Sequence, residues 1–94
     1  MGSSHLQSDA YQRFLPTLRQ WRERAGMSQV VLAEKLGKPQ NFVSRYEIGE
    51  RRVDAVELMR ILLALGLTWA DAEKSLLDAL KTERKPARPL PKNR

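Results

Sequence analysis

Four polar side chains near the middle of the chain have the types and spacing needed to read the edges of nucleic-acid bases. Gln40, Asn41, Ser44 and Arg45 occupy positions i, i+1, i+4 and i+5, which places them on one flank of a helix. A glutamine amide can pair with adenine N6 and N7, and a guanidinium with guanine O6 and N7, each discriminating by about 1–3 kcal/mol. The alternative is an ordinary solvated polar face.

The side chains that most catalytic and metal sites need are almost absent. The chain has no cysteine, and its single histidine is His5. Thiol nucleophiles, thiolate zinc sites and disulfides are therefore excluded, and no phosphate-binding loop or metal-ligand spacing is present. Asp71, Glu73 and Asp78 have the spacing of a solvated helix surface. We expect no enzyme activity, no cofactor and no metal.

The polar flank lies in the segment Ser28–Arg52, which has the pattern of two helices joined by a tight turn. Counting Gln29 as the first position, Ala33 is fifth, Gly37 ninth and Val43 fifteenth. The fifth residue must be small where the helices cross, the ninth needs a positive φ, and the fifteenth must be apolar to fill the crevice. This pattern predicts a helix-turn-helix that enters the major groove of DNA.

The remaining helices follow from capping residues and glycines, and we predict a compact all-α fold of five helices. The expected regular helices cover residues 16–25, 29–36, 39–48, 55–65 and 69–83. Ser28 and Asp54 are expected N-caps, and Thr68 with Asp71 an expected capping pair. Pro16 either lies in a first turn or kinks a longer helix, and we favour a kinked or broken start.

The two ends differ in composition from the middle. Residues 9–84 are expected to form the single domain, with disordered segments at 1–8 and 85–94. The opening MGSSH resembles an expression-tag remnant, and the final segment is basic and rich in proline. No signal peptide or membrane-length apolar run is present, so we expect a cytoplasmic protein.

The net charge of +6 is unevenly distributed along the chain. Residues 1–52 carry nine basic and five acidic groups, and residues 81–94 carry six basic and one acidic. Residues 53–80 carry two basic and five acidic groups and are therefore net acidic. Because the positive charge lies with the helix-turn-helix and the tail, it indicates a nucleic-acid partner.

Several motifs together resemble a known family. The stretches LRQWRERAGMSQ, LAEKLG, PQNFVSRYEIGERR and LMRILLALG are similar to the Cro and lambda-repressor type (XRE-like) of bacterial helix-turn-helix regulators. The resemblance covers residues 15–67 and implies a lambda-repressor-like domain whose second and third helices form the helix-turn-helix. The fifth helix and the tail lie outside the shared pattern.

The resemblance also implies roles for individual residues. Gln29 and the cap Ser28 are expected to contact a DNA phosphate together with the helix N-terminus, the alternative for Gln29 being a simple polar residue of the first turn. Arg22 and Glu47 match a structural ion pair that joins the first helix to the end of the third.

Other assignments come from the residues themselves and stay open. Lys38, Arg51 and Arg52 flank the recognition helix and are candidates for phosphate contact, the alternative being solvated loop charges. Phe42 either meets a thymine methyl or packs inside the fold, and packing is the favoured interpretation.

The helix over residues 55–65 is apolar on two faces, which indicates burial on both sides or an interface. Its two stripes are Ala55, Leu58, Leu62 and Leu65, and Val56, Met59 and Leu63. The next helix is expected to cover part of this surface through Trp69, Ala72, Leu76 and Leu80. The remainder would be available to a second subunit.

These observations predict a transcriptional regulator specific for double-stranded DNA, acting as a homodimeric repressor on a palindromic operator. Its half-sites would lie about 34 Å apart. The alternative is an antitoxin-type protein that neutralises a partner toxin and represses its own operon. That alternative is motivated by Val30 and Val31, which cannot both face the core, by the second apolar face of the helix over residues 55–65, and by the long tail.

Overall fold

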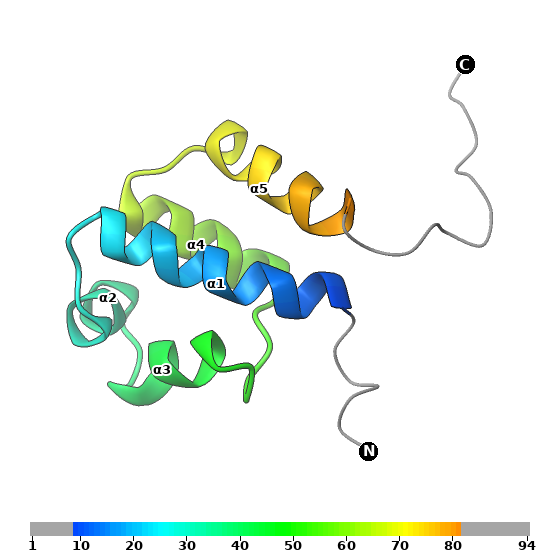
Figure 1. The fold of residues 1–94 in the computed structure, drawn as a ribbon. Helices are drawn as coiled ribbons and strands as arrows, with labels where there is room; N and C mark the ends of the chain where they lie inside the picture. Colours follow the sequence, from blue (N-terminus) through cyan, green and yellow to red (C-terminus); the bar gives the residue numbers. More distant parts are fainter. Residues whose placement is uncertain (1–8, 82–94) are drawn as a thin grey trace.

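The computed structural model describes residues 9–81, and the expectations for residues 1–8 and 82–94 lie outside this range. Within it the chain is all-α, as predicted, and forms five helices with no strand. The helices are α1 (Asp9–Arg24), α2 (Gln29–Leu36), α3 (Asn41–Glu47), α4 (Ala55–Leu65) and α5 (Trp69–Lys81). Figure 1 shows α1 between α5 on one side and α2 and α3 on the other, with α4 beside it.

The predicted helix starts are confirmed by their capping bonds. Ser28 Oγ accepts the backbone N–H of Val31 at 3.1 Å and begins α2. Asp54 begins α4 with a complete capping box, in which its side chain and that of Glu57 accept each other's backbone N–H. These bonds satisfy amides that a helix start would otherwise leave without partners.

The start of α5 is fixed by the same local chemistry. Thr68 Oγ1 accepts the N–H of Asp71 at 3.1 Å, and the Asp71 carboxylate accepts the N–H of Thr68 at 2.8 Å. These bonds hold the pKa of the Asp71 carboxyl below its ordinary value.

The first regular helix begins earlier than predicted, at Asp9 instead of Pro16. Pro16 lies inside α1, which is one helix from Asp9 to Arg24 with no break at the proline. A proline inside a helix removes one backbone hydrogen bond. Phe14, Leu15 and Leu18 are all buried around it, so tertiary packing on both sides of Pro16 offsets the lost bond.

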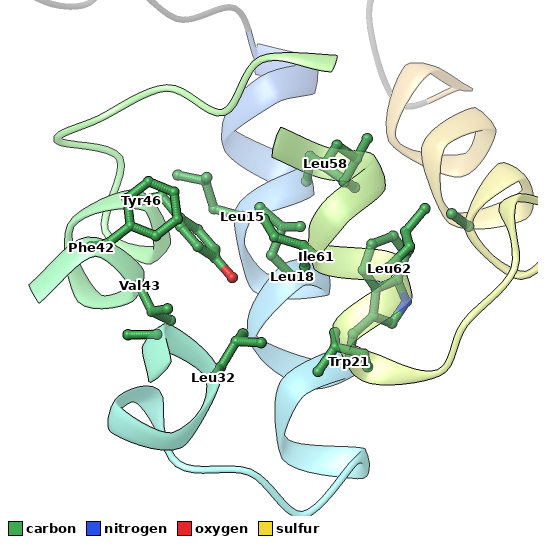
Figure 2. Packing of buried hydrophobic residues seen from close by; sticks show 14 residues of the cluster. Leu15, Leu18, Trp21, Leu32, Phe42, Val43, Tyr46, Leu58, Ile61 and Leu62 are labelled. Carbon is green, nitrogen blue, oxygen red and sulfur yellow. The ribbon is translucent and has the colours of Figure 1, made fainter. Parts of the chain in front are cut away.

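The core is formed where α1 to α4 meet (Figure 2). Its largest fully buried side chains are Tyr46, Leu18, Leu32, Ile61 and Val43. The hydroxyl of Tyr46 is buried without a hydrogen-bond partner in the described part of the chain. Burial raises the pKa of this phenol above its ordinary value, because its charged form would lose solvation.

The faces of α4 also differ in detail from the expected stripes. Ile61, which belonged to neither stripe, is fully buried, whereas Ala55 at the start of the helix is exposed. Val56, Met59 and Leu63 remain 55%, 48% and 77% exposed. The second stripe therefore forms an uncovered apolar face in this single chain.

The fifth helix leaves that face open because it lies mainly against α1 (Figure 1). Ala72 is fully buried and Leu76 partly buried, whereas Trp69 and Leu80 are exposed. The other tryptophan, Trp21 on α1, is buried and meets Phe14 edge to face with 5.7 Å between ring centroids. No helix among residues 9–81 has both the length and the apolar character to cross a membrane.

Candidate nucleic-acid interface

The turn between α2 and α3 has the geometry that the sequence predicted. Gly37 ends α2 with φ 68°, and a Cβ built there would meet nothing within 4 Å. Glycine is therefore required for its backbone conformation and not for lack of space. Ala33 and Val43 are both buried between the helices.

One flank of α3 is polar and the other is buried. Gln40, Asn41 and Arg45 are exposed, and Ser44 is half-buried with its Oγ donating to the carbonyl of Asn41 at 3.1 Å. On the other flank, Phe42, Val43 and Tyr46 are buried. The burial of Phe42 supports its packing interpretation over contact with a thymine methyl.

The recognition helix is shorter than predicted. It covers Asn41–Glu47 instead of residues 39–48, with Gln40 as its N-cap. Pro39 begins the turn that leads into it, since the Pro39 carbonyl accepts the N–H of Phe42 at 2.9 Å. The side chains predicted to face the bases consequently lie on the N-cap and the first five residues of the helix.

Arg45 has a partner on the same surface. Its Nε lies 3.5 Å from Glu50 Oε1, and both side chains are more than half exposed. An exposed pair of this kind contributes only about 0–1 kcal/mol. Arg45 can therefore exchange Glu50 for another acceptor at small cost.

Beneath the polar flank, Arg22 and Glu47 form a bidentate ion pair. Arg22 Nε donates to Glu47 Oε2 at 2.7 Å, and Arg22 Nη2 donates to Glu47 Oε1 at 3.0 Å. Arg22 Nη1 also donates to the carbonyl of Met27 at 2.9 Å. The hydrogen bonds to Glu47 raise the pKa of the Arg22 guanidinium, with desolvation opposing.

Gln29 joins this pair, which the sequence did not indicate. Its Nε2 donates to Glu47 Oε1 at 2.9 Å. One carboxylate at the end of α3 thus connects α1, α2 and α3. Among residues 9–81 no acceptor lies against the backbone N–H groups of Gln29 and Val30. The start of α2 therefore presents donors on the side of Ser28 and Gln29.

Arg51 also has structural bonds that the sequence analysis did not predict. Its Nη1 and Nη2 donate to the two carboxylate oxygens of Glu57 at 2.9 and 2.8 Å. The Arg51 guanidinium lies over the Phe42 ring, 4.8 Å from its centroid, and Lys38 Nζ lies 5.3 Å from the same centroid. Arg51 lowers the pKa of the Glu57 carboxyl, and the pKa of Arg51 is raised in return.

The loop after α3 is further held against the start of α1. Arg52 stacks over the Tyr11 ring at 4.3 Å, and the N–H of Val53 donates to the Tyr11 hydroxyl at 3.1 Å. The loop therefore presents Arg51 and Arg52 from a fixed backbone. Within the described residues, no three His, Cys, Asp or Glu side chains are grouped closely enough to hold a metal ion.

Comparison with known proteins agrees with this geometry. Residues 18–71 match the family described as helix-turn-helix. The chain is similar to the solved structure of an XRE-family like protein from Pseudomonas syringae pv. tomato str. DC3000, with a TM-score of 0.70 and 34% sequence identity. That similarity covers 82% of this chain and 94% of the other. No curated protein matches the chain.

Proposed function

Since this chain belongs to the XRE-type helix-turn-helix family of DNA-binding regulators, we propose that it is a transcriptional repressor that binds a palindromic operator as a homodimer. The observation that carries the proposal is the asymmetry of α3. Its polar flank is exposed, while its apolar flank is fixed in the core. Such a helix can enter the major groove without rearrangement of the fold.

Base recognition is assigned to the exposed flank of α3. Gln40, Asn41 and Arg45 present amide and guanidinium groups to the groove, and Ser44 supplies a hydroxyl at its edge. Release of Arg45 from Glu50 on binding would pair the guanidinium with a guanine edge.

Phosphate contact is assigned to the residues that border this flank. Ser28 and Gln29 lie at the start of α2, where free amides favour an anion. Lys38, Arg51 and Arg52 lie on the turn and loop on either side of α3. Because Arg51 is already bound to Glu57, we assign it to positioning the loop as well as to phosphate contact.

The homodimer is supported by the apolar surface that the single chain leaves uncovered. Six of the large hydrophobic residues that remain exposed belong to α4 and α5: Val56, Met59, Leu63, Trp69, Leu77 and Leu80. A second copy on this surface would present two recognition helices to half-sites about 34 Å apart. Such a regulator would act in the cytoplasm of a bacterial cell.

Selection from a random pool of duplex DNA tests the proposal. The full chain should enrich a palindrome, and Gln40→Ala and Arg45→Ala should each reduce discrimination at one base position by about five- to 150-fold. The control Glu34→Gln, on the exposed side of α2, should leave discrimination unchanged. Recovery of no preferred sequence, or full discrimination by both recognition-helix variants, would refute the proposal.

The dimer has its own test. Leu63→Glu should convert the chain to a monomer in sedimentation or light scattering, because it places a carboxylate at the most exposed residue of the uncovered face of α4. Val30→Glu, which places the same charge on another exposed apolar residue, on α2, is the control and should leave the mass unchanged. A wild-type chain that stays monomeric at the concentration of operator saturation would rule the homodimer out.

The antitoxin-type function remains the second candidate because Val30 and Val31 are exposed, at 39% and 42%. Two adjacent exposed valines on α2 offer an apolar contact that DNA binding does not use. Co-expression with the product of a neighbouring small reading frame tests this function. A stable complex that Val30→Glu abolishes would support it, and failure of the two chains to associate would exclude it.

A further inference from the structure

The amide of Gln29 is oriented by a buried carboxylate. Its Nε2 donates to Glu47 Oε1, the same oxygen that accepts Arg22 Nη2, while Glu47 Oε2 accepts Arg22 Nε. A carboxylate paired with a guanidinium only accepts hydrogen bonds. Gln29 must therefore turn its NH₂ group, and not its carbonyl oxygen, toward Glu47.

This orientation leaves the amide with one N–H to donate elsewhere. An amide nitrogen carries two hydrogens, and Glu47 takes only one of them. The backbone N–H groups of Gln29 and Val30 are also without acceptors among the described residues. A phosphate oxygen, which accepts only, would meet N–H groups at this helix start and not the Gln29 carbonyl oxygen.

We infer that Glu47 is a positioning residue for the DNA backbone. It touches no DNA, since its side chain is only 3% exposed, and it acts by holding the Gln29 amide in the orientation that a phosphate requires. The inference rests on the proposed function. It extends that function by giving Glu47 two roles. Its carboxylate binds Arg22 at the end of α3, and it also orients the side chain that contacts phosphate on α2.

The hydrogen bond between Gln29 and Glu47 has a physical consequence for DNA binding. A free glutamine side chain loses considerable rotamer entropy when it is immobilised. Glu47 already immobilises Gln29 in the unbound protein. The phosphate contact is therefore not weakened by a loss of rotamer entropy on binding. Removal of Glu47 should weaken binding to every duplex, whatever its sequence, because a phosphate contact carries no base information.

The test removes the Glu47 carboxylate together with its partner Arg22, so the net charge does not change. R22M/E47M deletes both charges of the buried pair, and replacement of such a pair by apolar side chains is compatible with folding. The variant is combined with Q29A in a double-mutant cycle on the full chain. Binding is measured against a selected operator and a random duplex of equal length, at a temperature where circular dichroism shows every variant folded.

Each of Q29A and R22M/E47M should weaken binding to both duplexes by about three- to tenfold. The triple variant should bind no worse than Q29A alone, because Glu47 has no other route to the phosphate. The matched control R19M/E23M deletes an exposed pair on the same helix, and it should leave both affinities unchanged. The inference would be overturned if R22M/E47M weakened DNA binding by the same factor in the wild-type chain and in the Q29A variant.

A second measurement needs no variant and covers the case in which R22M/E47M does not fold. In the ¹⁵N-labelled wild-type chain, DNA should shift mainly one of the two proton resonances of the Gln29 side-chain NH₂. Equal shifts of both protons would overturn the inference. If the wild-type chain binds no duplex at all, the proposed function is refuted and the inference falls with it.

Discussion

Truncation of Arg22 is the sharpest test of how this fold holds its recognition helix. In Arg22→Met the side chain keeps an unbranched apolar stem but loses the guanidinium. Glu47 would then keep only the hydrogen bond from Gln29, and the carbonyl of Met27 would lose its donor. The side chains of Arg22 and Glu47 are 9% and 3% exposed, so water cannot readily replace the lost partner.

The size of the loss follows from this burial. Removal of one partner from a buried ion pair costs about 3–5 kcal/mol, whereas an exposed pair contributes about 0–1 kcal/mol. A domain of this size has a free energy of unfolding of about 4–11 kcal/mol. Arg22→Met should therefore remove a large part of the stability, at about 4–8 °C of Tm for each kcal/mol.

Urea unfolding followed by far-ultraviolet circular dichroism measures this loss. The double variant R22M/E47M should recover most of it, because no charge is then left buried and unpaired. Arg19→Met, which removes one side of an exposed pair on the same helix, should change the free energy of unfolding by less than about 1 kcal/mol. A loss in Arg22→Met no greater than that in Arg19→Met, or a double variant as unstable as Arg22→Met, would show that Arg22 and Glu47 do not stabilise the fold as a buried pair.

Three further outcomes concern stability. Tyr46→Phe removes a buried hydroxyl that has no partner among the described residues, so the free energy of unfolding should stay equal or rise by about 1 kcal/mol; a loss above that size in urea unfolding would show that the hydroxyl is bonded. Gly37→Ala should cost about 1–2 kcal/mol because of its φ of 68°, and Gly37→Asn less; equal losses would contradict the backbone explanation. Arg51 lowers the pKa of Glu57 in the folded state, so this stabilisation should be complete above the ordinary glutamate pKa of about 4.3 and disappear as the pH falls through the lower folded value. The difference in Tm between wild type and Glu57→Gln should therefore shrink from pH 6 to pH 3, and a constant difference would argue against it.

The sequence predicted features that depend on neighbours a few residues apart. Ser28, Asp54 and Thr68 cap their helices through bonds that span three positions, and Gly37 supplies a conformation set by its own backbone. These interactions are local, so residue type and spacing are sufficient to predict them.

Features set by distant packing were predicted less well. The sequence left open whether Pro16 begins a helix or lies within a longer one, because the contacts that compensate for its missing N–H come from the core. Ile61 is buried and Ala55 is exposed because of the direction from which the neighbouring helices approach α4. That direction is not encoded within the sequence of α4, so the two stripes could not predict it.

The polar site shows the same division. The exposed flank of α3 follows from helical periodicity, and the Arg22–Glu47 pair was expected only through a family resemblance. The hydrogen bond from Gln29 to Glu47 spans 18 positions. It could not be predicted because glutamine and glutamate can form hydrogen bonds with many other residues of the chain. Arg51 and Glu57 lie six positions apart across a loop. Their opposite charges beside the helix cap Asp54 could have predicted the pair, but Arg51 was assigned to phosphate contact instead.

The two tryptophans give this chain a pair of intrinsic optical reporters. Trp21 is 7% exposed and Trp69 is 54% exposed, so iodide should quench the emission of Trp69 and leave that of Trp21 nearly unchanged. Unfolding would shift the Trp21 emission to longer wavelength. Any association that covers α5 would protect Trp69 from iodide as protein concentration rises, which separates loss of structure from loss of assembly in one cuvette without a dye.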